Sequence, residues 1–200
     1  MRLPVITIWL LLHIASGSLL AQPANDSVFA HTAIQSCKLV NAHNKSTAIK
    51  NRTAAKPLLL FVFLSPECPL CKNYAPVLND LEKQWDETVA FVGIVPGRTY
   101  SAAVVKAFAH KYQLSFPVFI DPVKKLTSYL HASITPEVIL LNNRYELVYK
   151  GAIDNRVKQL GIKRWQATEN YLSDAVSQYL QHAGVAVKRV KAIGCLINDF

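Results

Sequence analysis

A pair of cysteines separated by two residues, Cys68 and Cys71, is the part of this sequence best suited to chemistry. It follows residues 58–64, an apolar run rich in Phe and Val that predicts a central strand buried on both faces. Over residues 69–85, apolar side chains recur at helical spacing, and Pro69 suits the first turn because its missing N–H is harmless there. The pair therefore caps a helix that follows a buried strand, which is the context of a redox C-x-x-C motif.

The two cysteines are expected to have unequal roles. Unpaired backbone N–H groups and the dipole at a helix start favour a thiolate, so the pKa of Cys68 should fall from about 8.5 into roughly the 3.5–7.5 range. The strand–helix junction should also expose this sulfur. Cys71 lies three residues on, where it can attack a mixed disulfide formed by Cys68. Cys68 is thus the predicted nucleophile and Cys71 the predicted resolving thiol.

Metal binding and structural bonding are the alternatives to redox chemistry at this pair. A zinc site would need a second pair of ligands, and the sequence has neither another C-x-x-C nor histidines at H-x₃₋₅-H spacing. We therefore expect no metal and no cofactor. A Cu(I)-binding chaperone would combine soft thiolates with a histidine. His131 is the only histidine near Pro136 in the sequence, and an ordinary surface residue explains it better.

Further apolar runs predict alternating strands and helices on both sides of the pair. The expected strands are residues 89–95, 117–120, 137–141 and 147–149, and the expected helices are residues 101–112, 122–131 and 168–183. Their alternation implies parallel βαβ units, whereas the turn sequence Asn-Asn-Arg at 142–144 implies an antiparallel hairpin. A mixed sheet is therefore predicted.

The chain begins with a stretch typical of export. One charge, Arg2, precedes the apolar residues 3–20, and small and polar residues take over at Ala21. We expect a signal peptide over residues 1–21 with cleavage near Ala21; the alternative is an uncleaved N-terminal membrane anchor, because about 18 apolar residues approach the span of a bilayer. Residues 22–54 are expected to form an N-terminal extension that could include a β-hairpin of residues 36–40 and 47–50. Residues 55–184 would form the redox domain and residues 185–200 a C-terminal tail.

Composition and charge limit the location and the partners. The balance of 51% hydrophobic and 18% charged residues is that of a globular protein, and the net charge is +9. The basic residues are spread without aromatic interleaving, so we expect no nucleic-acid binding. A peripheral or anchored membrane association is the remaining alternative. Export implies an oxidising compartment such as the periplasm, in which we expect a monomer that exchanges with protein dithiols or disulfides and with an upstream redox donor.

The residues around the pair resemble those of thioredoxins. The segment F-V-F-L-S-P-E-C-P-L-C-K-N-Y-A-P, residues 61–76, is similar to their strand, active-site loop and helix, in which Pro76 would bend the helix. Ile-Thr-Pro-Glu-Val at residues 134–138 resembles the segment in which a cis-proline faces the disulfide. That resemblance implies that Thr135 and Pro136 hold the substrate chain, although the sequence does not show the isomer.

An added unit, residues 115–131, is absent from minimal thioredoxins and resembles the exported redoxins, which include AhpC/TSA, peroxiredoxin-like and TlpA/ResA-like members. Gly194-Cys195 is similar to a G-C ending of some peroxiredoxin-like redoxins. The resemblance implies an α/β thioredoxin-like fold, with a central mixed β-sheet, helices on both faces and an extra strand–helix insertion. The implied activity is that of a thiol–disulfide oxidoreductase.

The chain departs from the thioredoxin pattern around the pair. Glu67 stands where thioredoxins have tryptophan, and Pro-Leu replaces Gly-Pro between the cysteines. Val62 stands about where a buried acid would shuttle the proton of Cys71. Water, Glu67 and Glu137 are the alternatives for that role.

A thiol peroxidase is the nearest alternative function. Ser65-x-x-Cys68 matches the T/S-x-x-C core of peroxiredoxins, but Phe61 stands where that family has a proline. Whether the pair reduces, oxidises or isomerises its partners depends on its reduction potential and on the donor.

Two further cysteines, Cys37 and Cys195, have no motif of their own. In an oxidising compartment an even number of cysteines favours a structural disulfide between them, which would tie the tail to the first strand. The alternative is that Cys195 is a third redox thiol that reaches Cys68.

Overall fold

A computed structural model describes residues 28–41, 43, 45–47 and 56–197. The expected signal peptide or anchor, most of the second hairpin strand and the last three residues lie outside these ranges. Among the described helices, none is long and apolar enough to cross a membrane.

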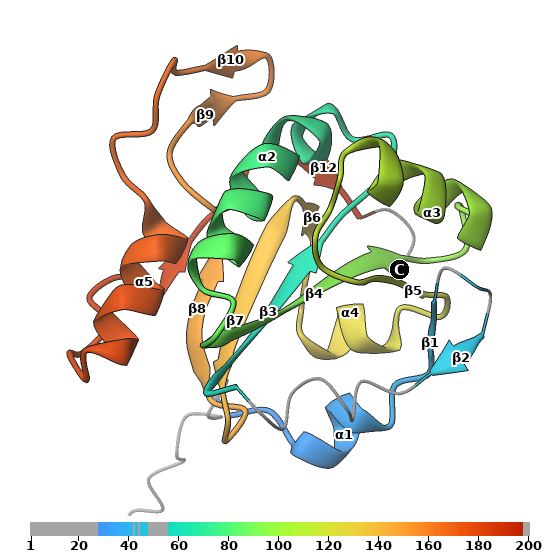
Figure 1. Cartoon of the computed structure of the whole chain (residues 1–200), viewed down its shortest axis with the longest axis horizontal. Helices are drawn as coiled ribbons and strands as arrows, with labels where there is room; N and C mark the ends of the chain where they lie inside the picture. Colours follow the sequence, from blue (N-terminus) through green and yellow to red (C-terminus); the bar gives the residue numbers. More distant parts are fainter. Residues whose placement is uncertain (1–27, 42, 44, 48–55, 198–200) are drawn as a thin grey trace, which may run out of the picture.

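A mixed eight-stranded sheet forms the centre of the molecule (Figure 1). Its order is β11-β8-β7-β3-β4-β5-β1-β2. The bounds are β1 Leu39–Val40, β2 Ser46–Thr47, β3 Leu58–Phe63, β4 Val89–Pro96, β5 Val118–Asp121, β7 Glu137–Asn142, β8 Leu147–Gly151 and β11 Arg189–Val190. Strands β3, β4 and β5 are parallel, whereas β7 is antiparallel to both β3 and β8. The predicted mixed sheet is confirmed.

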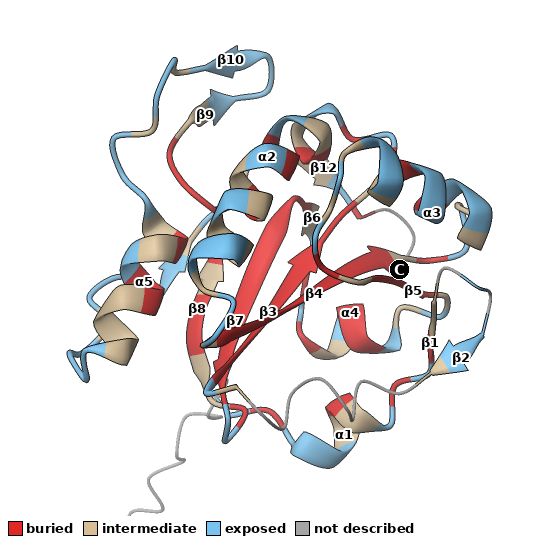
Figure 2. Ribbon diagram, in the orientation of Figure 1, coloured by how far each residue is buried: buried red, intermediate tan, exposed pale blue. Residues whose placement is uncertain are grey.

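Helices cover both faces of this sheet. Their bounds are α1 His31–Gln35, α2 Pro69–Gln84, α3 Ala102–Lys111, α4 Lys125–Tyr129 and α5 Tyr171–Leu180. Because side chains alternate along a strand, Leu58, Leu60 and Val62 of β3 pack with α2, α3 and α5. Leu59, Phe61 and Phe63 pack on the opposite face with α1 and α4. Every residue of β3 is therefore buried, as the apolar run predicts (Figure 2).

The insertion predicted over residues 115–131 forms β5 and α4. Strand β5 continues the parallel order beyond β4, and β1 then pairs antiparallel with it through Val40 and Ile120. The N-terminal extension thus adds two strands to the sheet. The expected hairpin is present, and its first strand begins at Leu39 rather than Ser36, because Ser36 ends the unpredicted helix α1.

The C-terminal tail is paired at two places. Strand β11 runs parallel to β8, and β12 (Cys195–Leu196) pairs antiparallel with β6 (Ile134–Thr135). The approach of β11 requires Gly151, where φ is +137° and an added Cβ would lie 1.7 Å from the Val190 carbonyl oxygen. A second short hairpin, β9 (Val157–Gln159) and β10 (Ile162–Lys163), projects beyond α2 (Figure 1). Strands β6, β9, β10, β11 and β12 were not predicted, because strands of two or three residues are too short to show a period in the sequence.

Candidate active site

The cysteine pair lies at the carboxyl end of β3, where the chain turns into α2. Cys68 has an extended backbone and immediately precedes the helix, which begins at Pro69. Cys71 lies in the first turn and is completely buried. The strand, the helix and the position of the pair agree with the sequence-based expectation.

Three groups surround the sulfur of Cys68. The Thr135 carbonyl oxygen lies 3.1 Å from Cys68 Sγ, at a Thr135–Pro136 peptide bond that is cis. Cys195 Sγ lies 2.6 Å from Cys68 Sγ, and the thiol of Cys71 hydrogen-bonds to the same sulfur from the helix. The structure therefore brings Thr135 and Pro136 to the pair, and it adds Cys195.

These contacts give the thiols of Cys68 and Cys71 different pKa values. Hydrogen bonding by the Cys71 thiol lowers the pKa of Cys68 to about 4, with burial opposing and the Cys195 thiol contributing a further hydrogen bond. Burial, followed by the hydrogen bond to Cys68 and its charge, raises the pKa of Cys71. The site therefore holds a thiolate at Cys68 and a protonated thiol at Cys71, which are the states that a nucleophile and a resolving thiol need.

The position of Cys195 beside Cys68 contradicts two sequence-based expectations. The predicted Cys37–Cys195 disulfide is wrong, because Cys37 is buried in the core on the other face of the sheet, where its thiol donates to the Ala33 carbonyl at 3.3 Å. Cys195 instead pairs in register with Thr135. The predicted exposure of Cys68 is also wrong: only 2% of its surface is accessible, because the tail lies against it.

Of the two acids proposed as proton carriers, one lies in the exposed loop before Cys68 and the other on the opposite face of the sheet. Glu67 is exposed in the loop before Cys68. Glu137 belongs to β7 and, by strand alternation, shares the face of Ile139 opposite to the one that contacts Cys71. It accepts a hydrogen bond from the Ser133 N–H at 3.0 Å and lies 4.0 Å from Lys150 Nζ. The accessory role predicted for Glu137 is therefore not supported, since neighbouring residues of a strand point to opposite faces.

Ser65 touches the site through its backbone. Its N–H donates to Cys71 Sγ at 3.4 Å, whereas its hydroxyl lies 3.2 Å from the Tyr100 hydroxyl. The side chain of Ser65 thus faces Tyr100, and its amide faces the resolving thiol.

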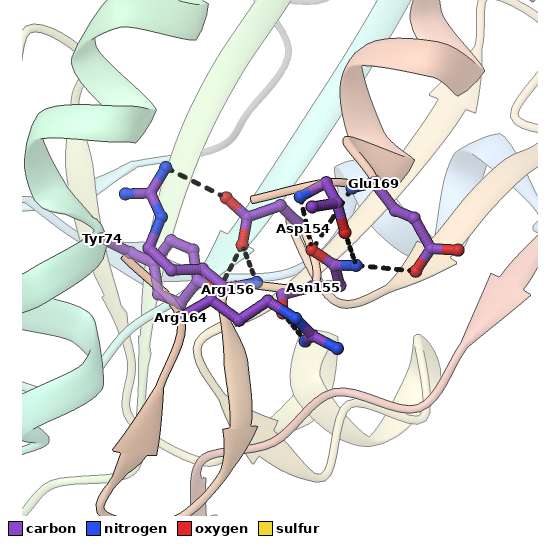
Figure 3. A network of polar contacts seen from close by, with 7 residues as sticks. Tyr74, Asp154, Asn155, Arg156, Arg164 and Glu169 are labelled. Atoms are coloured by element: carbon purple, nitrogen blue, oxygen red, sulfur yellow. Dashed lines mark hydrogen bonds and ion pairs between the residues drawn. The ribbon is translucent and has the colours of Figure 1, made fainter. Parts of the chain in front are cut away.

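A cavity of about 340 Å³ lies beside Pro136. A polar network forms part of its wall (Figure 3). The Tyr74 hydroxyl of α2 donates to buried Asp154 at 2.6 Å, and Arg156 lies 3.4 Å from the other oxygen of that carboxylate. Asn155 continues the network by donating to Glu169 at 2.8 Å. The network joins the active-site helix to the chain after β8, one turn beyond Cys71.

The polar network in this cavity wall was not predicted from the sequence. The signal was present as two adjacent polar residues, Asp154 and Asn155, directly after the apolar residues Ala152 and Ile153. Polar side chains that are buried in this way are normally hydrogen-bonded, so their position next to a strand end indicates a structured site.

The histidine considered for Cu(I) lies elsewhere. His131 lines a different cavity together with Cys37. Within the described ranges, no three or more His, Cys, Asp or Glu side chains are grouped so as to hold a metal ion.

Comparison with known proteins agrees with this fold. The family model described as Redoxin matches residues 29–164, so the chain belongs to the redoxin family. This membership, together with the sheet order and the C-x-x-C helix, defines a thioredoxin-like redoxin. No curated protein matches the chain.

Solved structures share the fold at low sequence identity. A hypothetical protein from Sinorhizobium meliloti 1021 is 24% identical with a TM-score of 0.71, over 80% of this chain and 88% of that chain. An uncharacterized conserved protein from Geobacillus kaustophilus is 22% identical with a TM-score of 0.71, over 82% and 88%. A secreted Mycobacterium tuberculosis disulfide oxidoreductase, homologous to DsbE of E. coli, is 18% identical with a TM-score of 0.50, over 59% and 84%.

Proposed function

We propose that this redoxin is a thiol–disulfide oxidoreductase that exchanges its Cys68–Cys71 dithiol or disulfide with protein substrates outside the cytoplasm. One observation supports it above the others: Cys68 stands at the start of α2 beside the buried thiol of Cys71, whose hydrogen bond lowers the pKa of Cys68 to about 4. A nucleophile with its resolving thiol already in contact is the arrangement that two-step exchange requires.

The reduced pair reacts in two displacements. The Cys68 thiolate attacks one sulfur of a substrate disulfide, so that a mixed disulfide forms and the second substrate sulfur leaves as a thiolate. Cys71 then loses its proton and attacks Cys68 Sγ. The mixed disulfide breaks, the substrate leaves as a dithiol, and the pair is left oxidised. An upstream dithiol donor returns it to the reduced state, and the same steps in reverse would oxidise a substrate.

Thr135 and Pro136 are proposed to hold the substrate backbone. The Thr135 carbonyl lies 3.1 Å from Cys68 Sγ, and β6 already forms main-chain pairs with an extended segment, β12, along one edge. An extended peptide that adds to this edge would present its cysteine to Cys68.

Reduction of a protein disulfide such as that of insulin tests the proposal. We expect Cys68→Ser to abolish catalysis, and Cys71→Ser combined with Cys195→Ser, which removes both thiols beside Cys68, to accumulate mixed disulfides at Cys68. Cys37→Ala, which changes a cysteine on the other face of the sheet, is the matched control and should keep the wild-type rate. Full activity of Cys68→Ser would overturn the proposal.

Hydrogen peroxide separates this function from the peroxidase alternative. A peroxidase would direct the Ser65 hydroxyl at a peroxide bound to Cys68, whereas this hydroxyl faces Tyr100 at 3.2 Å. We therefore expect insulin to be reduced far faster than peroxide is consumed. The reverse ranking would favour the peroxidase.

The proposed location outside the cytoplasm is supported by the apolar residues 3–20 and the small residues that follow them. Cell fractionation followed by N-terminal sequencing tests it. A mature protein that begins at Gln22 in the extracytoplasmic fraction is expected. A membrane-bound chain that retains Arg2 would instead support the anchor, and a cytoplasmic chain would contradict both.

A further inference from the structure

The C-terminal tail occupies the edge on which a protein substrate would dock. Cys195 and Leu196 pair antiparallel with Thr135 and Ile134. The Thr135 hydroxyl lies 3.4 Å from the Cys195 carbonyl, and the Ile197 N–H donates to the Ser133 carbonyl at 2.9 Å. This main-chain pairing continues along β6, beside Pro136. The tail is therefore held in the manner of an added strand.

The pairing brings a thiol to the nucleophile. Cys195 Sγ lies 2.6 Å from Cys68 Sγ, and Cys195 is only partly exposed. In the reduced protein this thiol donates a hydrogen bond to the Cys68 thiolate, as a leaving substrate thiol would. Burial, followed by that hydrogen bond and the negative charge of Cys68, raises the pKa of Cys195 to about 11. When Cys68 is part of a disulfide its charge is gone, and Cys195 can lose its proton more easily.

We infer that the tail is an intramolecular substrate of the active site, in which Cys195 is a third redox thiol that forms a disulfide with Cys68. This inference rests on the proposed exchange chemistry of Cys68. It makes the tail and a protein substrate mutually exclusive, because both need the free edge of β6.

The exchange needs no external oxidant once Cys68 and Cys71 are joined. The Cys195 thiolate attacks Cys68 Sγ, the Cys68–Cys71 bond breaks, and Cys71 leaves as a thiolate. The proton released by Cys195 goes to Cys71. One disulfide replaces another, so the number of electrons on the protein does not change. Attack by Cys71 on Cys68 Sγ reverses the step and frees the tail.

A substitution at Gly194 tests the docking of the tail on β6. A Cβ at this position would lie 2.2 Å from the Thr135 carbonyl oxygen, so Gly194→Ala must lift the tail from β6 while Cys195 stays in the chain. Gly184 is the matched control, since a Cβ there meets nothing within 4 Å. Both variants add the same methyl group.

The first experiment maps the disulfide. The full chain with Cys71→Ser is treated with oxidised glutathione, which forms a mixed disulfide at Cys68 that Cys195 displaces with release of glutathione. After tryptic digestion, mass spectrometry is expected to find the Cys68 peptide joined to residues 192–200. A glutathione adduct that persists on Cys68 beside a free Cys195 would overturn the inference.

The second experiment tests docking. In the Cys71→Ser background, Gly194→Ala should slow formation of the Cys68–Cys195 bond by about tenfold or more, because it removes the alignment of the two sulfurs. Gly184→Ala should form the bond at the original rate. Equal rates in the two variants would show that the tail does not align Cys195.

The two proposals fail in different ways. Formation of the Cys68–Cys195 bond by a protein that does not catalyse insulin reduction would refute the proposed function and support the third thiol. If the wild-type protein reduces insulin but no Cys68–Cys195 bond forms, the third thiol alone is refuted. For the protein with only Gly194→Ala, alkylation of Cys68 should be faster than with Gly184→Ala, since the tail lies against this residue, of which only 2% is exposed. An unchanged alkylation rate would overturn the docking of the tail.

Discussion

Replacing Cys71 with alanine should raise the pKa of Cys68, because the Cys71 thiol is the main group that stabilises the thiolate. A hydrogen bond to a charged group contributes about 1.5–3 kcal/mol, and one pKa unit corresponds to about 1.4 kcal/mol. The loss of this bond should therefore move the pKa from about 4 to roughly 5–6. Because the pKa of Cys68 is depressed, its thiolate exists above this pKa and is lost as the pH falls through it.

The pH dependence of iodoacetamide alkylation measures this change. At about pH 5 the variant should react about two- to tenfold more slowly than the wild-type protein, whereas at about pH 8 the pKa change should leave the rate unaffected, because both thiolates are then fully formed. Cys71→Ser is the matched control, since its hydroxyl can still donate and should keep the midpoint nearer to that of the wild type. Because Cys71→Ala leaves one cysteine in the tryptic peptide of Cys68, mass spectrometry can assign the modification without ambiguity.

A wild-type midpoint near 9 would refute the thiolate. A midpoint that stays near 4 in Cys71→Ala would refute the Cys71 hydrogen bond as its cause and transfer the effect to the Cys195 thiol or to the helix start.

Three further predictions follow from the same contacts. Between about pH 5 and pH 8 the potential of the Cys68–Cys71 pair should fall by about 30 mV per pH unit, because the reduced pair binds one proton, at Cys71, for two electrons; a slope of about 60 mV in the redox titration would contradict this. Tyr74→Phe should lower the free energy of unfolding by about 1.5–3 kcal/mol, because it removes a hydrogen bond to the buried Asp154 carboxylate, and a urea midpoint equal to that of the wild type would exclude such a contribution. Glu137→Gln should leave the alkylation profile of Cys68 unchanged, since the carboxylate lies on the far face of the sheet; a shifted midpoint would restore Glu137 as a proton carrier.

The long periodic elements of this fold could be predicted from the sequence. The position of the Cys68–Cys71 pair could be predicted with them. Residues 58–64 form β3 almost as predicted, because a two-sided buried strand must be apolar throughout. The active-site helix likewise shows its own period and its first-turn proline. Because the C-x-x-C lies between these two elements in the sequence, its position at the strand–helix junction followed from local pattern alone. The roles of Cys68 and Cys71 stay predictions.

The partner of Cys195 could not be predicted in this way. Its neighbour Thr135 lies 60 residues earlier in the chain, and the strand that joins them has two residues. Pairing of that kind depends on where β11 leaves the sheet and on burial of Ile197, neither of which has a periodic signal. An even cysteine count favoured Cys37 as the partner, but the sheet itself separates the two sulfurs. The face of the sheet on which Glu137 lies could not be predicted for a similar reason, because it depends on the register of β7 rather than on residue type.

The attachment of β11 to β8 has a kinetic consequence for small thiols. Strand β11 ends at Val190 and β12 begins at Cys195, so only a short connection separates a segment fixed on the sheet from the reactive sulfur. Short tethers of this kind hold a group at an effective concentration on the order of millimolar or more. A free thiol such as glutathione would have to reach a comparable concentration before it could compete with Cys195 for Cys68. On the third-thiol inference, the anchored tail would favour reductants that bind the protein over those that meet it only by collision.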